Sequence, residues 1–88
     1  MREEKIRKKI DELLYKLNKM TDGNFRIETT IKMKEGEEYE SLELCEIKES
    51  GYSNKLFKKN SLTDFYSTLI VFVSGVNTVI MQILDCSI

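Results

Sequence analysis

Apolar and polar residues recur with two different periods along this chain, and each period predicts one kind of element. Between residues 2 and 20 the apolar residues return every three or four positions, and most of the other positions are charged. This spacing predicts an amphipathic helix with a single apolar stripe, supported by acid-first pairs four residues apart such as Glu3 and Arg7. The Asp-Gly-Asn sequence at residues 22–24 predicts the end of this helix.

Residues 25–34 alternate strictly between two sets of side chains, which is typical of a half-buried strand. The set expected to face the core is Phe25, Ile27, Thr29, Ile31 and Met33. Glu35-Gly36 is expected to turn the chain, and residues 38–49 are expected to form the returning strand of an antiparallel hairpin.

Cross-strand pairing favours a three-residue loop that brings Lys34 opposite Glu38. That register groups three opposite-charge pairs on one face and three apolar pairs on the other, whereas a two-residue loop sets Met33 against Glu38 and is expected to bury acids. A consequence of the three-residue loop is that Leu42 and Leu44 fall on the polar face as an exposed apolar patch. The alternative is a β-bulge near residue 44 that turns both leucines inward.

The C-terminal part of the chain holds the most ambiguous segment. Residues 65–84 carry no charge over 20 positions, which is long enough to span a bilayer. At about 100° per residue the polar side chains gather on one arc, and Ser61 supplies an N-cap, so we expect an amphipathic helix over residues 62–85. A membrane tail anchor and a β-hairpin remain the alternatives, and residues 55–58 are a further option for a short third strand.

These elements predict an α+β fold of the order α-β-β-(β)-α. The two amphipathic helices are expected to pack on one face of a small antiparallel sheet, with residues 1–88 forming a single domain. At this length the core is modest and the stability marginal.

The composition argues against an enzyme. The chain has no histidine, and its four glycines stand alone, so no His-based catalytic or metal arrangement and no glycine-rich phosphate loop is expected. We therefore expect no catalytic residues, no cofactor and no metal. Cys45 and Cys86 are expected to be buried thiols, and the charged N-terminus carries no secretory signal, which predicts a cytoplasmic protein.

The net charge of −1 hides a polar distribution of charge along the chain. Residues 1–20 sum to +3, residues 24–49 to −4 and residues 50–60 to +3, a layout that suits a macromolecular partner. We expect the acidic hairpin, residues 35–49, to bind a protein through its carboxylates and the leucine patch. The expected contact residues are Glu35, Glu37, Glu38, Glu40, Leu42, Glu43, Leu44 and Glu46.

Nucleic acid is the alternative partner. Lysines and arginines on the first helix, together with Lys55, Lys58 and Lys59, could contact phosphates. The α-β-β-β-α order resembles the double-stranded-RNA-binding domain, which implies RNA contacts from the first helix and the start of the second. The resemblance is one of topology, because Lys58 and Lys59 precede the second helix and Ser-Leu-Thr-Asp opens it.

Small uncharged residues such as Ser67, Ser74, Gly75 and Thr78 line one side of the helix expected over residues 62–85. They would let another helix approach closely, so a homodimer through this helix is expected, without contact to a membrane. The leading hypothesis is a small non-enzymatic protein-binding or inhibitor module, similar in general build to phage-encoded inhibitors such as the anti-CRISPR proteins. A nucleic-acid-binding module and a structural homo-oligomer subunit are the alternatives.

Overall fold

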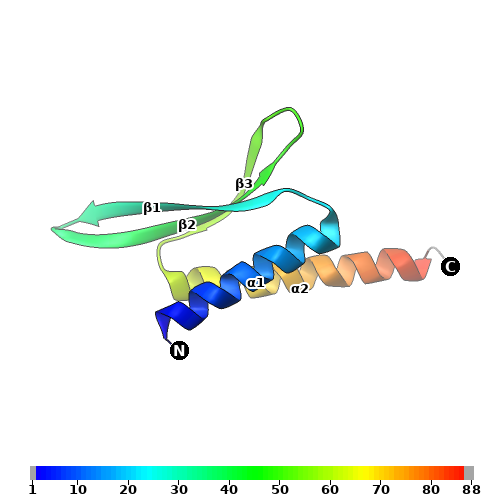
Figure 1. Cartoon of the computed structure of the whole chain (residues 1–88), viewed down its shortest axis with the longest axis horizontal. Helices are drawn as coiled ribbons and strands as arrows, with labels where there is room; N and C mark the ends of the chain where they lie inside the picture. Colours follow the sequence, from blue (N-terminus) through cyan, green and yellow to red (C-terminus); the bar gives the residue numbers. More distant parts are fainter. Residues whose placement is uncertain (1, 87–88) are drawn as a thin grey trace.

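The computed structural model describes the backbone of residues 2–86 and the side chains of residues 2–83. The elements follow in the order α1 (Glu3–Thr21), β1 (Phe25–Lys34), β2 (Glu37–Ile47), β3 (Ser53–Lys59) and α2 (Leu62–Cys86). The strands form an antiparallel sheet in the order β1-β2-β3, and both helices lie on one face of it (Figure 1). The predicted α+β class is confirmed, and the optional third strand is present.

Helix α1 buries its apolar stripe, and its last turn is connected to the start of β1 by hydrogen bonds. Ile6, Ile10 and Leu17 are buried, as the periodicity predicts. The helix ends at Thr21 and is followed by the C-cap residue Asp22, whose φ of 51° lies in the left-handed region. Asn18 then holds the first residue of β1 from both sides: the Phe25 N–H donates to Asn18 Oδ1 at 2.6 Å, and Asn18 Nδ2 donates to the Phe25 carbonyl at 3.1 Å. The start of the sheet is thereby fixed to the last turn of α1.

The β1–β2 hairpin closes through a two-residue turn, Glu35-Gly36, and the three-residue loop expected from the sequence is wrong. Ile27 pairs with Leu44 in the observed register. Both turn residues have positive φ, 53° at Glu35 and 80° at Gly36, as a type I′ turn requires. The expected register is off by one residue, so the side chains of β2 face the side opposite to the one predicted.

The observed register buries Leu42 and Leu44, which we expected to be exposed. Their exposed fractions are 3% and 0%, and they belong to the same core cluster as Phe65 and Leu69 of α2. Burying a leucine contributes about 1.5–3 kcal/mol, whereas an exposed cross-strand charge pair contributes about 0.2–1 kcal/mol. The two leucines under the helices therefore outweigh the charge pairs on which the expected register rested.

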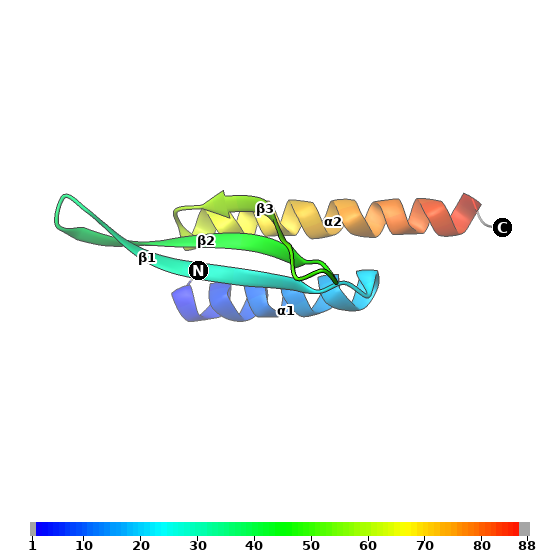
Figure 2. The same ribbon diagram turned by 90° about the horizontal axis from the view of Figure 1, so that it is seen from above.

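The acids that this register was expected to bury are not buried, because the β1–β2 hairpin extends past the N-terminal ends of both helices (Figures 1 and 2). Glu38 is exposed, and Glu40 is partly exposed beside α1. Ile31 and Met33, which we expected in the core, are 59% and 65% exposed on the same extension. Where the hairpin extends past the helices, the helix side of the sheet is exposed to solvent and can carry acids, although the same side forms the core beneath the helices.

Strand β3 is longer than the segment expected from the sequence and pairs with β2 from Leu42 onward. The register between β2 and β3 shifts between Leu44 and Cys45, which marks an irregularity near the place where we considered a β-bulge. This irregularity is not the reason why Leu42 and Leu44 face the core, because the register set by the two-residue turn places them on that side. Phe57 of β3 enters the aromatic part of the core, with its ring centroid 5.3 Å from that of Phe65 and 5.9 Å from that of Phe72.

Helix α2 confirms the predicted helix and excludes the β-hairpin alternative. Its first turn is capped as expected, since the Asp64 N–H donates to Ser61 Oγ at 3.1 Å. Phe65, Leu69 and Val73 are buried, and α2 runs beside α1 in the same direction (Figures 1 and 2). By length and composition alone, the segment Leu62–Ile83 could cross a membrane. Its mean hydropathy is 1.5, and 11% of its most apolar 18-residue stretch is buried.

The unusual turn residue makes the register testable. Glutamate at φ 53° is strained, because only glycine and, less well, asparagine and aspartate adopt this region readily. We expect Glu35→Asn to raise the free energy of unfolding by about 0.5–1 kcal/mol, measured by urea denaturation. Glu37→Asn, one position beyond the turn in β2, is the matched control and should not stabilise. Equal effects of the two variants would contradict a type I′ turn at Glu35-Gly36.

Candidate protein-binding surface

The most exposed ordered part of the sheet is the hairpin tip, residues 31–39, which lies beyond the N-terminal ends of both helices (Figure 1). By strand pairing, Ile31 and Met33 share the helix-side face with the residues opposite them, Glu40 and Glu38. No helix covers this face at the tip, so two large apolar side chains stand in solvent among carboxylates. Lys32, Lys34 and Tyr39 belong to the other face.

The structure does not present the predicted acidic hairpin as one continuous acidic surface. Successive residues of β2 alternate between the two faces, so the carboxylates are divided between them. Three of them are in ion pairs: Glu40 Oε2 lies 2.8 Å from Arg7, Glu46 Oε1 lies 2.8 Å from Lys48, and Glu43 Oε1 lies 3.9 Å from Lys55. Among the described residues, the acids without an ion pair in residues 35–46 are Glu35, Glu37 and Glu38.

Of the eight contact residues expected from the sequence, the tip therefore retains Glu35, Glu37 and Glu38. Leu42 and Leu44 lie in the core and are inaccessible to a partner. Sequence reasoning missed Ile31 and Met33, because their alternation is that of core residues. The signal that could have found them is the pair of acids opposite, since two glutamates on a core face indicate that this part of the face is not covered.

Arg7 of α1 holds the base of the tip in place. Its guanidinium donates to Glu40 Oε1 and Oε2 at 3.0 and 2.8 Å, and to Glu3 Oε1 at 2.8 Å. These hydrogen bonds to Glu40 and Glu3 raise the pKa of Arg7, so the cation is retained at all ordinary pH values. Both contacts to Glu40 come from the same nitrogen, Nη2, and this charge-assisted interaction links the hairpin to α1 next to the point where the tip leaves the helices.

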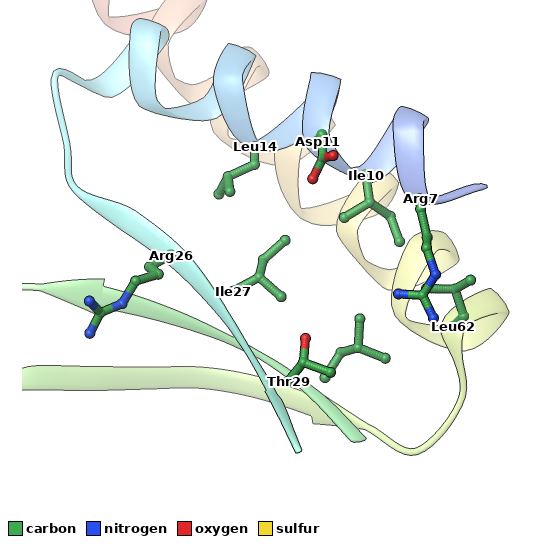
Figure 3. A pocket seen from close by; sticks show the side chains of 9 residues that line it. Arg7, Ile10, Asp11, Leu14, Arg26, Ile27, Thr29 and Leu62 are labelled. Atoms are coloured by element: carbon green, nitrogen blue, oxygen red, sulfur yellow. The ribbon is translucent and has the colours of Figure 1, made fainter. Parts of the chain in front are cut away.

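Between α1 and β1 lies a small open cavity of about 330 Å³ (Figure 3). Apolar side chains from both elements, among them Ile10, Leu14 and Ile27, line it, and Arg7 lies at one end. Arg26 points away from it in Figure 3. Asp11 and Thr29 add polar groups to the lining, but Arg7 is already paired with two glutamates, so the cavity by itself does not define a ligand.

The uncovered face of the sheet holds a second cluster of titratable groups. The ligand atoms of Glu28, Glu43 and Cys45 lie within 4.8 Å of one another, and Lys55 lies 3.9 Å from Glu43. Burial of the thiol, followed by the charge of Glu28, raises the pKa of Cys45. Three donors are one short of a tetrahedral site, and a metal would have to displace both a proton and Lys55. The cluster fits a metal poorly.

Lysines from the two edge strands also meet across this face. Interaction with Lys32 lowers the pKa of Lys58, because two ammonium groups near one another disfavour the charged form. Ser41 lies on the central strand between these edge strands, and its buried hydroxyl makes no hydrogen bond in the described part of the chain. The uncovered face is therefore mixed in charge, with carboxylates and ammonium groups side by side.

Comparisons with protein-family models, with curated protein sequences and with solved structures find no match to this chain. The class defined by the fold is an α-β-β-β-α protein with two helices on one face of a three-stranded antiparallel sheet. The functional argument therefore rests on the surface itself.

Cys45 provides a test of the uncovered face. It is a free, buried thiol with a raised pKa, so it stays protonated in the folded chain where an unfolded thiol, with a pKa of about 8.5, begins to ionise. Its contribution to stability is full below that pH and is lost as pH rises through the folded-state pKa. In a Cys86→Ser background, we expect Cys45 to react with a disulfide reagent at pH 8 at least about 100-fold more slowly than in urea. Equal rates would show that the thiol is accessible.

Proposed function

We propose that this chain is a non-enzymatic protein-binding module that contacts its partner through the hairpin tip. The observation that supports the proposal is the exposure of Ile31 and Met33, at 59% and 65%, on a two-stranded ribbon that no helix covers. Large apolar side chains surrounded by charges are the usual centre of a protein–protein contact, with the charged rim giving orientation and specificity. The tip is narrow, so it suits a cleft better than a flat surface.

The chemistry of the tip defines the expected partner. The carboxylates of Glu35, Glu37 and Glu38 surround the turn without ion pairs among the described residues. A complementary cleft has an apolar floor for Ile31 and Met33 and a basic rim for these acids. Occupation of such a cleft would block it to other ligands, which is how a small module of this kind acts as an inhibitor.

Nucleic-acid binding is the second candidate, supported by the element order shared with the double-stranded-RNA-binding domain. The charge distribution weighs against it. Arg7 is occupied by two glutamates, Asp64 stands in the first turn of α2, and the β1–β2 turn is acidic. Phosphate contacts need unpaired cations at these positions.

A capture experiment tests the hairpin-tip proposal. The tagged chain is incubated with nuclease-treated lysate of its native host, and bound proteins are quantified by mass spectrometry. We expect the double variant Ile31→Ser/Met33→Ser to lose the bound partner by about tenfold or more, as for contact residues worth over 1.4 kcal/mol. Since both side chains are exposed, unfolding free energies should change by no more than about 0.5 kcal/mol.

The matched control is Tyr15→Ser/Tyr52→Ser, which removes two exposed apolar side chains, 69% and 67% exposed, away from the hairpin tip. It should retain the partner. Loss of binding in the control alone would refute the tip as the contact. If the partner is recovered only from lysate that has not been treated with nuclease, and if its recovery falls steeply with salt, the binding function would belong to the basic residues of α1 and β3 instead.

A further inference from the structure

The molecule exposes more surface than its mass requires. A folded monomer of 10.3 kDa has an accessible surface of about 5,400 Å², and this chain exposes 6606 Å². Its radius of gyration is 14.9 Å, against about 12 Å for a compact domain of this length. The excess of about 1,200 Å² is larger than the 800 Å² or so that each partner buries in a typical interface.

Part of this excess lies on α2, at the end of the molecule opposite to the hairpin tip (Figures 1 and 2). The helix continues past the end of α1, and its exposed apolar side chains include Val71 at 72% and Val79 at 53%. An open groove of about 550 Å³ lies where α1 ends, lined by Met20, Thr21, Phe72, Gly75, Val76, Val79 and Ile80. This end is therefore an apolar surface with a groove.

The exposed side of α2 has a regular arrangement. Val71, Gly75 and Val79 follow one another at intervals of four residues, which forms a single ridge along a helix. Gly75 is exposed, and a Cβ built on it meets no atom within 4 Å. Glycine inside a helix lowers helix stability, and no contact among the described residues requires it. A close approach of another backbone at Gly75 would explain it.

We propose that α2 pairs with α2 of a second copy, antiparallel and about a two-fold axis that passes near Gly75. The axis sets Val71 of one copy against Val79 of the other, twice, because the two valines lie equally far from Gly75 in sequence. Val71 of each copy then lies beside the groove of the opposite copy, because Val79 is one of the residues that line that groove. The missing side chain at Gly75 lets the two ridges cross at short distance.

Charge favours a second copy as the occupant. In a two-fold interface each residue near the axis faces its own equivalent, so a charged residue there would repel itself. Residues 65–84 carry no charge in a chain that is otherwise 33% charged, so the ridge avoids this cost completely. Antiparallel pairing also leaves both hairpin tips free, at opposite ends of the dimer.

A lipid bilayer is a poor occupant for the same helix. Helix α1 runs beside α2, and ten of its 19 residues are charged. A bilayer around Leu62–Ile83 would immerse these charges. The part of α2 past Ile80 is far shorter than the roughly 20 residues that a span needs.

Sedimentation velocity across about 1 to 100 µM tests the proposal. We expect the wild-type chain to approach twice 10.3 kDa as concentration rises. Gly75→Leu should raise the dissociation constant at least about tenfold, while the monomer melts at the same or a higher temperature, because leucine favours the helix and a Cβ at this position meets no atom within 4 Å among the described residues. Ser74→Leu places the same new side chain at the neighbouring position, on a different side of the helix; it is the matched control and should still dimerise.

A second variant guards against misfolding of the first. Val71→Lys changes a 72% exposed side chain, so the fold should persist. The dimer should dissociate, because each lysine would place an unpaired cation against Val79 of the opposite copy. A wild-type chain that stays monomeric throughout the series would overturn the proposal, as would a dimer that resists both variants. Flotation of the wild-type chain with neutral phosphatidylcholine vesicles, without self-association, would overturn it in favour of a membrane.

Discussion

The register of the β1–β2 hairpin is the constraint on which the rest of the structure depends. A strand has only two faces, and a shift of one residue exchanges them completely. With the two-residue turn, Leu42 and Leu44 point at the helices and meet Phe65 and Leu69. With a three-residue loop, Ser41 and Glu43 would point there instead, and the core would lose both leucines. The strain of Glu35 in the turn, of order 1–3 kcal/mol, is small beside that loss.

The sequence predicts the elements well and the pairing between the strands badly, for one physical reason. Helix and strand limits follow from periodicity and end signals, which are local; the predicted helix over 62–85 and the observed Leu62–Cys86 differ by one residue. Register depends on where the helices lie over the sheet, which is not local. The charge pairs favoured the wrong answer because they lie toward the ends of the hairpin, whereas the decisive burial occurs in the middle of β2. Glu-Gly is also a weaker turn signal than Asn-Gly or Asp-Gly.

The proposed contact surface overlaps the surface expected from the sequence at the acidic turn, and it differs in its apolar part because Leu42 and Leu44 are buried. The acidic turn at Glu35, Glu37 and Glu38 is visible in the sequence as a cluster of charge, and it lies at the exposed tip. The apolar part of the surface is Ile31 and Met33, not the two leucines. Their exposure follows from the length of the hairpin relative to the helices, which no single position in the sequence reveals. Ion pairs such as Arg7–Glu40 likewise depend on elements far apart in the chain.

The two projecting parts of this small protein have a common origin. A core built from two helices and the middle of three strands covers only the centre of each long element, so β1 and β2 project at one end and α2 at the other (Figure 1). Segments with few buried contacts open more easily than the core does, and a chain of 88 residues has little stability in reserve. Contacts at both ends, one with a second copy and one with a partner, would bury apolar surface that the monomer leaves exposed, and the free energy of association would then add to that of folding. The two proposed contacts would thus account for the length of these elements beyond their core.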